Sequence, residues 1–153
     1  MPKLYIMCGI PGSGKTTFAR KLALARNAHL VSSDSIREEL TGDANNQDIN
    51  HRVFEVMHER IHQHLVNGRN VIADATNIKR WSRKQIVDLK TPETAVFFIV
   101  MDTSLHESKR RNQSRDRVVP EEVIDRMWKN FEFPQDDEGI VFFVDDEVAG
   151  NIP

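Results

Sequence analysis

The chain has 153 residues, of which 39% are hydrophobic and 29% charged, and its formal net charge is −2. This size and composition are those of an ordinary globular protein, so we expect residues 1–153 to form a single domain. The sequence has no apolar run of about 18 residues and no targeting signal, which excludes a membrane-spanning helix and predicts a cytoplasmic protein. The charge is not typical of a nucleic-acid-binding protein, and the single cysteine, Cys8, excludes an internal disulfide.

Apolar segments alternate with helical patterns along the chain. In chain order, we expect strand 3–9, helix 14–26, strand 28–32, helix 33–40, helix 49–67, strand 70–77, helix 80–89, strand 95–102, helix 104–115, helix 120–131 and strand 139–146. Asp34 or Ser35 can cap the second helix, Gly68 is a stop signal for the third, and Ser104 with Glu107 forms a capping box. Strands separated by helices require crossover connections, so the pattern predicts a five-stranded parallel sheet in a three-layer α/β fold.

A glycine-rich segment follows the first expected strand. Gly9, Gly14, Lys15 and Thr16 satisfy the spacing G-x-x-x-x-G-K-[ST] of a P-loop. In such a turn, backbone N–H groups converge on a phosphate, the lysine reaches the β- and γ-phosphates, and the hydroxyl binds Mg²⁺. We therefore expect ATP or another NTP with Mg²⁺ as cofactors. The expected cofactor-binding residues here are Gly12, Ser13, Gly14, Lys15, Thr16 and Thr17.

Polar side chains follow the second and third expected strands, where ligands of parallel sheets bind. Asp34 can act as a general base for an attacking hydroxyl, or it can serve only as the helix cap. Arg37 can grip an anionic acceptor, or it can pair in solvent with Glu38. Asp74 is expected to bind metal or substrate at the end of its strand. Thr76 and Asn77 either contact the substrate or hold the loop.

A basic run, Ser108–Arg117, has five cations and one Asp. Arg111 and Arg115 are four residues apart on the expected helix 104–115, so both side chains should emerge on one side. They could neutralise charge on the transferred phosphoryl group as a helical lid over the nucleotide. Lys109, Arg110 and Arg117 are interpreted as solvent-facing or as steering the substrate.

Other candidate residues have simpler interpretations. His51, His58 and His62 share one face of the expected helix 49–67, opposite its apolar face, and are expected to be exposed polar residues rather than a metal site. Trp81 and Trp128 have apolar neighbours, which favours packing over base stacking. Cys8 is expected to be buried in its strand.

Together, the segments "GIPGSGKTTFAR", "SSDSIR", "DATN" and "RRNQSRDRVVPEEVIDRM" resemble the kinase domain of bacteriophage-type 5′-hydroxyl polynucleotide kinases. The resemblance implies that Lys15 and Thr16 bind phosphate and magnesium and that Asp34 activates the 5′-hydroxyl. It implies that Arg37 contacts the phosphate beside the acceptor nucleotide. Arg111 and Arg115 match lid arginines that contact the donor, whereas the match of Asp74 is loose.

The sequence therefore predicts an NTP-dependent kinase of the 5′-hydroxyl end of DNA or RNA, with Lys15, Asp34 and Arg115 as its catalytic residues. A kinase of the same fold that acts on a sugar, antibiotic, nucleoside or nucleotide is the first alternative. A nucleotide-dependent switch without an acceptor is the second. It is disfavoured because Asp34, Arg37 and the lid arginines would then have nothing to act on.

Overall fold

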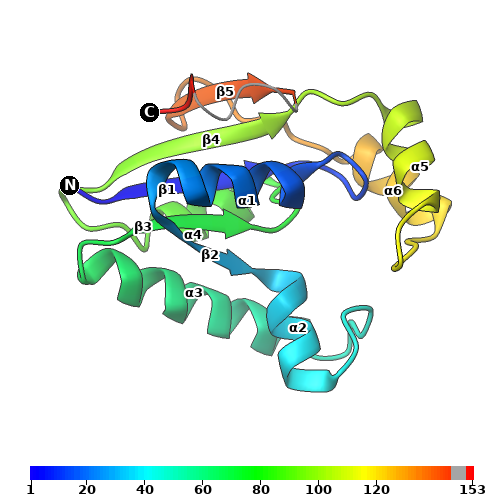
Figure 1. The fold of residues 1–153 in the computed structure, drawn as a ribbon, viewed down its shortest axis with the longest axis horizontal. Helices are drawn as coiled ribbons and strands as arrows, with labels where there is room; N and C mark the ends of the chain where they lie inside the picture. The colour runs from blue at the N-terminus through cyan, green and yellow to red at the C-terminus, as the bar shows by residue number, and fades with distance from the viewer. Residues whose placement is uncertain (146–150) are drawn as a thin grey trace.

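A computed structural model describes residues 1–145 and 151–153 of the chain. Five parallel strands form one sheet in the order β2-β3-β1-β4-β5, which confirms the predicted sheet. The strands are β1 (Lys3–Cys8), β2 (Ala28–Ser32), β3 (Asn70–Asp74), β4 (Ala95–Met101) and β5 (Ile140–Val144). The helices are α1 (Lys15–Arg26), α2 (Ser33–Thr41), α3 (Asn50–Val66), α4 (Arg80–Val87), α5 (Leu105–Gln113) and α6 (Glu121–Lys129). The strands point toward the end of the molecule where α2, α5 and α6 lie (Figure 1).

Helices cover both faces of the sheet, as predicted for a three-layer fold. On one face, Phe18 and Leu22 of α1 pack with Met7 and Ile99 of the strands. On the other face, α3 and α4 pack against side chains of β1, β3 and β4. Cys8 is fully buried in β1, as expected, and burial raises the pKa of its thiol to about 12. The parallel, doubly covered sheet gathers the loops that follow β1, β2, β3 and β4 at one edge.

One predicted helix cap and two predicted element ends differ from the structure. The cap of α2 is Ser32, whose hydroxyl accepts a hydrogen bond from the Ser35 N–H at 3.3 Å, so Asp34 is free of the capping role. Strand β3 ends at Asp74, as expected for this carboxylate, and does not extend to Asn77, whose backbone is left-handed with φ 46°. The predicted end of the last strand, Asp146, lies outside the described residues.

The predicted end of the lid helix is wrong. Helix α5 ends at Gln113, so Arg115 lies beyond it and does not share a helical face with Arg111. The buried side chain of Asn112 explains this ending. Its amide donates to the Val119 carbonyl at 2.7 Å and its oxygen accepts from the Val119 N–H at 3.0 Å, so the chain must turn back at this point.

None of the helices in the described part of the chain is long and apolar enough to cross a membrane.

Candidate active site

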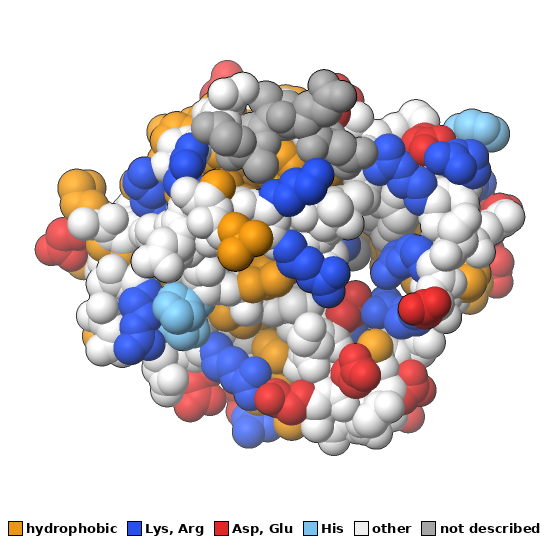
Figure 2. Space-filling view, viewed as in Figure 1, with side chains coloured by type: hydrophobic (Ala, Val, Ile, Leu, Met, Phe, Trp, Pro, Cys, Tyr) orange, Lys and Arg blue, Asp and Glu red, His pale blue; other side chains and the backbone are white. Residues whose placement is uncertain are grey.

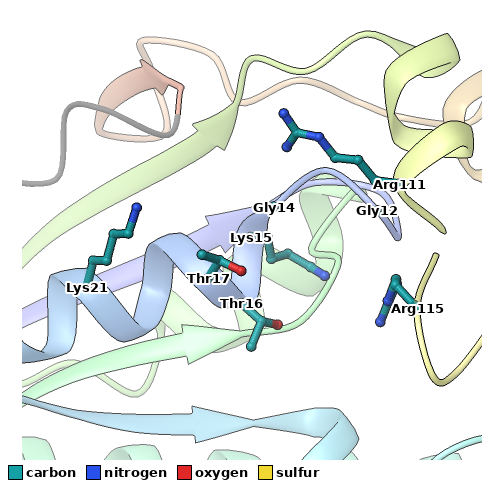
Figure 3. A pocket seen from close by; sticks show the side chains of 8 residues that line it. All are labelled: Gly12, Gly14, Lys15, Thr16, Thr17, Lys21, Arg111 and Arg115. Carbon is teal, nitrogen blue, oxygen red and sulfur yellow. The ribbon is translucent and has the colours of Figure 1, made fainter.

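A cavity of about 350 Å³ lies between the P-loop and the lid formed by α5 and the segment after it. Its lining consists of Gly12, Gly14, Lys15, Thr16, Thr17, Lys21, Arg111 and Arg115, which are shown in Figure 3. Most of the predicted nucleotide-binding residues therefore meet here, with the addition of Lys21 from α1. On the face that carries α1, Lys and Arg side chains gather around the hollow beside the lid (Figure 2). The cavity has the charge expected for a polyphosphate.

The P-loop takes its shape from two glycines and a set of backbone hydrogen bonds. Gly12 and Gly14 have φ values of 83° and 90°, which side-chain-bearing residues rarely adopt. The Gly9 N–H donates to the Thr76 carbonyl at 2.9 Å and thereby ties the loop to the end of β3. Ser13 was predicted to contact the cofactor, but its side chain is buried and its N–H donates to the Ile10 carbonyl at 3.2 Å. Ser13 thus supports the turn rather than lining the cavity.

Helix α5 rests directly on the P-loop. A Cβ atom added at Gly12 would lie 2.1 Å from the carbonyl oxygen of Ser108 in α5. The Thr103 hydroxyl, just before α5, donates to the Ser13 carbonyl at 2.9 Å. These contacts bring Arg111, on the next turn of α5, to the cavity, as predicted.

The lid arginines differ in their electrostatic environment. Glu107 accepts hydrogen bonds from Arg110 and from Arg111, and these bonds lower the pKa of its carboxyl to about 2. Arg115 is half-buried, and burial together with the charge of Arg117 lowers the pKa of its guanidinium. The charges of Asp34 and Asp74 act on Arg115 in the opposite direction. An anion bound in the cavity would therefore stabilise the charged form of Arg115.

Asp74 lies beneath the P-loop helix. Its side chain is 3% exposed, and its Oδ2 accepts a hydrogen bond from the Thr16 hydroxyl at 3.0 Å. Its Oδ1 is buried and has no hydrogen-bond partner among the described residues. Burial raises the pKa of this carboxyl, although Lys15 and Thr16 act to lower it. A buried carboxylate with an unused oxygen beside a hydroxyl fits the hard oxygen ligands that Mg²⁺ prefers.

The remaining ligands of a magnesium ion would have to be phosphate oxygens and water. Across residues 1–145 and 151–153, there is no group of three or more His, Cys, Asp or Glu side chains that could hold a metal ion. Mg²⁺ commonly binds through one or two protein groups together with substrate phosphates, so the pair of Thr16 and Asp74 is consistent with such a site.

Asp34 projects from the first turn of α2 with both carboxylate oxygens engaged. Its Oδ1 lies 2.9 Å from Arg37 Nη1, and its Oδ2 lies 2.8 Å from Arg117 Nη1. The Asp34 side chain retains 40% of its exposure, so it can still be reached from solvent. Arg37, in contrast, is buried, and its Nη2 donates to Asn50 Oδ1 at 2.6 Å, so a solvated pair with Glu38 is excluded.

Arg117, like Lys21, is a residue of this site that the sequence did not assign to the candidate nucleotide or acceptor residues. The sequence favoured a solvent-facing or substrate-steering role for Arg117, but its side chain is only 24% exposed and reaches from the lid segment to Asp34. The signal in the sequence that could have indicated this role is the position of Arg117 in the basic run, two residues after Arg115. The contact joins the lid to α2 across the mouth of the site.

Thr76 and Asn77 hold the loop after β3. The Asn77 amide donates to the Met7 carbonyl at 2.7 Å, and the Asn77 carbonyl accepts from Arg83 Nη1 at 2.9 Å. Arg83 is fully buried and pairs with Glu138 through Nε at 2.9 Å. Asn77 therefore has the structural role, because its side-chain amide is hydrogen bonded in the interior of the protein.

The histidines and tryptophans follow the predictions only in part. His51 and His62 are exposed as predicted, whereas His58 is half-buried, and burial lowers the pKa of its imidazole. Trp128 is partly buried beside two phenylalanine rings, in agreement with packing. For Trp81 the prediction is wrong, since 64% of this residue is exposed at the start of α4.

Comparison with known proteins agrees with this geometry. Residues 4–134 match the AAA domain family. The chain is 24% identical over 147 residues to the gluconokinase of Gluconobacter oxydans (strain 621H), covering 92% of this chain and 81% of the relative. It is 28% identical over 147 residues to the L-seryl-tRNA(Sec) kinase of Methanococcus maripaludis, covering 86% of this chain and 53% of the relative.

A solved structure has a similar fold and a related sequence. A chain of the Pnkp1/Rnl/Hen1 RNA repair complex superposes with a TM-score of 0.74 at 30% identity, covering 84% of this chain and 43% of that chain. The chain thus spans about half the length of the tRNA kinase and of this repair protein. Because the family match extends over most of the sequence and the relatives share its fold, the chain belongs to the AAA domain family and is a P-loop kinase domain.

Proposed function

We propose that the protein transfers the γ-phosphoryl group of ATP or another NTP to the 5′-hydroxyl end of DNA or RNA. The observation that carries this proposal is the pair of Asp34, whose charge acts on Arg115 of the nucleotide cavity, and a buried arginine, Arg37, that is hydrogen bonded to it. A hydroxyl next to a phosphodiester presents both groups that such a pair would recognise. The carboxylate orients the hydroxyl and the guanidinium holds the phosphate.

The donor side follows from the lining of the cavity. The P-loop N–H groups and Lys15 hold the β- and γ-phosphates, and Lys21 adds charge at the same wall. Mg²⁺, held through Thr16 and Asp74, would supply charge neutralisation between the phosphates. Arg111 and Arg115 enter from the lid and stabilise the charge that spreads over the transferred phosphoryl oxygens.

The acceptor side requires two changes in the site: Asp34 must release one guanidinium, and buried Arg37 must become reachable by the acceptor phosphate. The Asp34 oxygens are paired with Arg37 and Arg117, so an incoming hydroxyl must take the place of one guanidinium. Arg117 is the partner that can leave, because it belongs to the lid segment, whereas Arg37 is buried and fixed by Asn50. Displacement of Arg117 would free one oxygen to accept the proton of the hydroxyl.

A kinase of a small hydroxyl compound is the second candidate, and the observation that favours it is the gluconokinase similarity along 92% of the chain. Two observations weigh toward the polynucleotide. Buried Arg37 provides an anion-binding group at the acceptor, and a 30% identical chain occurs in an RNA repair complex. A switch without an acceptor would leave the pair of Asp34 and Arg37 without a function.

The test is a labelling assay with γ-labelled ATP, offering 5′-hydroxyl oligodeoxynucleotides, oligoribonucleotides and a sugar panel that includes gluconate. We expect label on the oligonucleotide end and none on the sugars. Asp34→Asn should bind ATP normally and lose roughly 100-fold or more in phosphoryl transfer, since general-base catalysis contributes about 10²–10⁴-fold. Asp136→Asn, in an exposed loop, is the matched control. Label on gluconate alone would overturn the proposal, as would full activity of Asp34→Asn.

A further inference from the structure

A second cavity, of about 710 Å³, lies between helices α3 and α4 and is separate from the nucleotide cavity. It is called the α3–α4 groove here and is lined by Asn50, His51, Phe54, Glu55, His58, Asn77, Trp81, Ser82, Gln85, Ile86 and Asp88. None of these residues lines the nucleotide cavity. Its volume lies within the range of pockets that bind small organic groups.

The groove is connected to the acceptor side of the active site by one hydrogen bond. Asn50, in the first turn of α3, lines the groove and accepts from Arg37 Nη2 at 2.6 Å. The other terminal nitrogen of the same guanidinium, Nη1, lies 2.9 Å from Asp34. Asp34, Arg37 and Asn50 therefore form a continuous path from the candidate base to the groove.

The side chains of the groove select for a flat, uncharged group with a polar edge. Phe54 of α3 and Trp81 of α4 give it two aromatic side chains, and Trp81 is 64% exposed. Asn50, Ser82 and Gln85 offer neutral hydrogen-bonding groups. An exposed tryptophan beside amide and hydroxyl groups is the chemistry that stacks a nucleobase and contacts its edge.

The charges of the groove exclude a phosphate. The charged lining residues are Glu55 and Asp88, and no lysine or arginine is among the described residues that line it. A phosphodiester would be repelled there, whereas the buried Arg37 next to the groove would attract it. Phosphate and base thus have separate, adjacent places.

We propose that the α3–α4 groove binds the base of the second nucleotide of the acceptor strand, with Trp81 as its stacking platform. This assignment follows from the order of Asp34, Arg37 and Asn50 along the path. The 5′-hydroxyl lies at Asp34, the following phosphate at Arg37, and the next nucleoside beyond Asn50. This inference rests on the proposed function and extends it, because it explains how the protein distinguishes a polynucleotide from a single nucleotide or a sugar.

The experiment compares three acceptors: a nucleoside 3′-monophosphate, a dinucleotide, and the same dinucleotide with an abasic second position. We expect the dinucleotide to have a kcat/KM roughly tenfold above the other two, within the range that base stacking on an aromatic side chain provides. Trp81→Ala should remove this advantage and leave the monophosphate unchanged, and Trp81→Phe should restore most of it. Leu24→Ala, at an exposed position on α1, is the control and should keep the advantage.

A binding measurement separates the two proposals. The chain has two tryptophans, so Trp128→Phe leaves Trp81 as the sole indole fluorophore. A dinucleotide that lacks the 5′-hydroxyl should quench this fluorescence saturably, and its abasic counterpart should not. Equal kcat/KM for the three acceptors without saturable quenching would overturn the groove assignment and leave the kinase proposal standing. Failure to phosphorylate any nucleotide acceptor would overturn the kinase proposal itself, and this assignment with it.

Discussion

Substitution of Gly12 by alanine tests how the lid depends on the P-loop. The new Cβ would lie 2.1 Å from the backbone oxygen of Ser108, whereas real Cβ contacts are essentially never closer than 3.0 Å. Ser108 is fully buried and the contact is with its backbone, so no side-chain rotation can relieve it. Helix α5 must therefore move by about 1 Å, and Arg111 moves with it.

The magnitude has two parts. A non-glycine residue in the left-handed region costs roughly 1–2 kcal/mol, and overpacking adds about 1–3 kcal/mol. Alanine returns about 0.5–1 kcal/mol by restricting the unfolded chain. The net loss of about 1–4.5 kcal/mol corresponds to a melting temperature lower by roughly 2–18 °C for a domain of this size. Displacement of a positioned group by 1 Å can cost about 100-fold in rate, so we expect kcat/KM for the nucleotide to fall by roughly 10–100-fold.

Gly42→Ala is the matched control. Gly42 has a similar φ of 76° at the end of α2, but an added Cβ would have nothing within 4 Å. This variant should show the backbone cost alone, about 1 kcal/mol, with normal nucleotide kinetics. Thermal denaturation and steady-state kinetics of both variants make the comparison. Equal effects of Gly12→Ala and Gly42→Ala in both assays would refute the contact of α5 with the P-loop as the determinant of lid position.

Three further predictions concern charged groups. Asp74→Asn should stabilise the ligand-free protein by about 1 kcal/mol, which raises its melting temperature. The same variant should lose Mg²⁺-dependent activity. Burial raises the pKa of Asp74, so the ionised carboxylate destabilises the folded protein at neutral pH. In a denaturation series, the stability that Asp74→Asn gains over the unsubstituted protein should therefore shrink as the pH falls through the folded-state pKa of Asp74. Arg117→Ala should lower the acceptor KM by up to about fivefold, because the acceptor no longer has to break the partly exposed pair of Arg117 and Asp34, which is worth about 0.2–1 kcal/mol. A raised KM would show that Arg117 binds the acceptor instead. Arg83→Met should cost about 3–5 kcal/mol in urea unfolding, because it removes the close guanidinium from buried Glu138, which keeps only the Gln135 N–H at 2.9 Å and Arg80 at 3.9 Å. The double variant with Glu138→Gln should recover most of this loss.

The fold could be predicted because its determinants are local. Apolar runs of strand length alternate with amphipathic segments, and this pattern alone requires crossovers and a parallel sheet. The P-loop spacing then places its phosphate site at the carboxyl edge of the sheet. The error at the end of α5 occurred where a side-chain contact outside the helical repeat decides the backbone. Asn112 ends α5 by binding Val119, a contact that no periodicity of the helix reveals.

The nucleotide side of the site was easier to predict than the acceptor side. Lys15, Thr16 and Arg111 belong to continuous motifs, so their spacing in the sequence fixes their place in the cavity. Arg37, Asn50 and Trp81 come from three different helices, and only the fold brings the path from Asp34 to the groove together.

Trp81 is exposed although the sequence predicts that its side chain packs. Apolar neighbours in the sequence favoured packing, yet most of this large ring remains in contact with water, which the hydrophobic effect opposes. Phe54 is partly buried on the neighbouring helix and is packed against the core, so the space between the helices stays open rather than collapsing. Collapse would have required Trp81 to fold toward α3 and fill the space itself. An aromatic side chain held apart from the core thus leaves a stacking surface available in the α3–α4 groove. The proposed polynucleotide acceptor would use this surface, and a sugar would not.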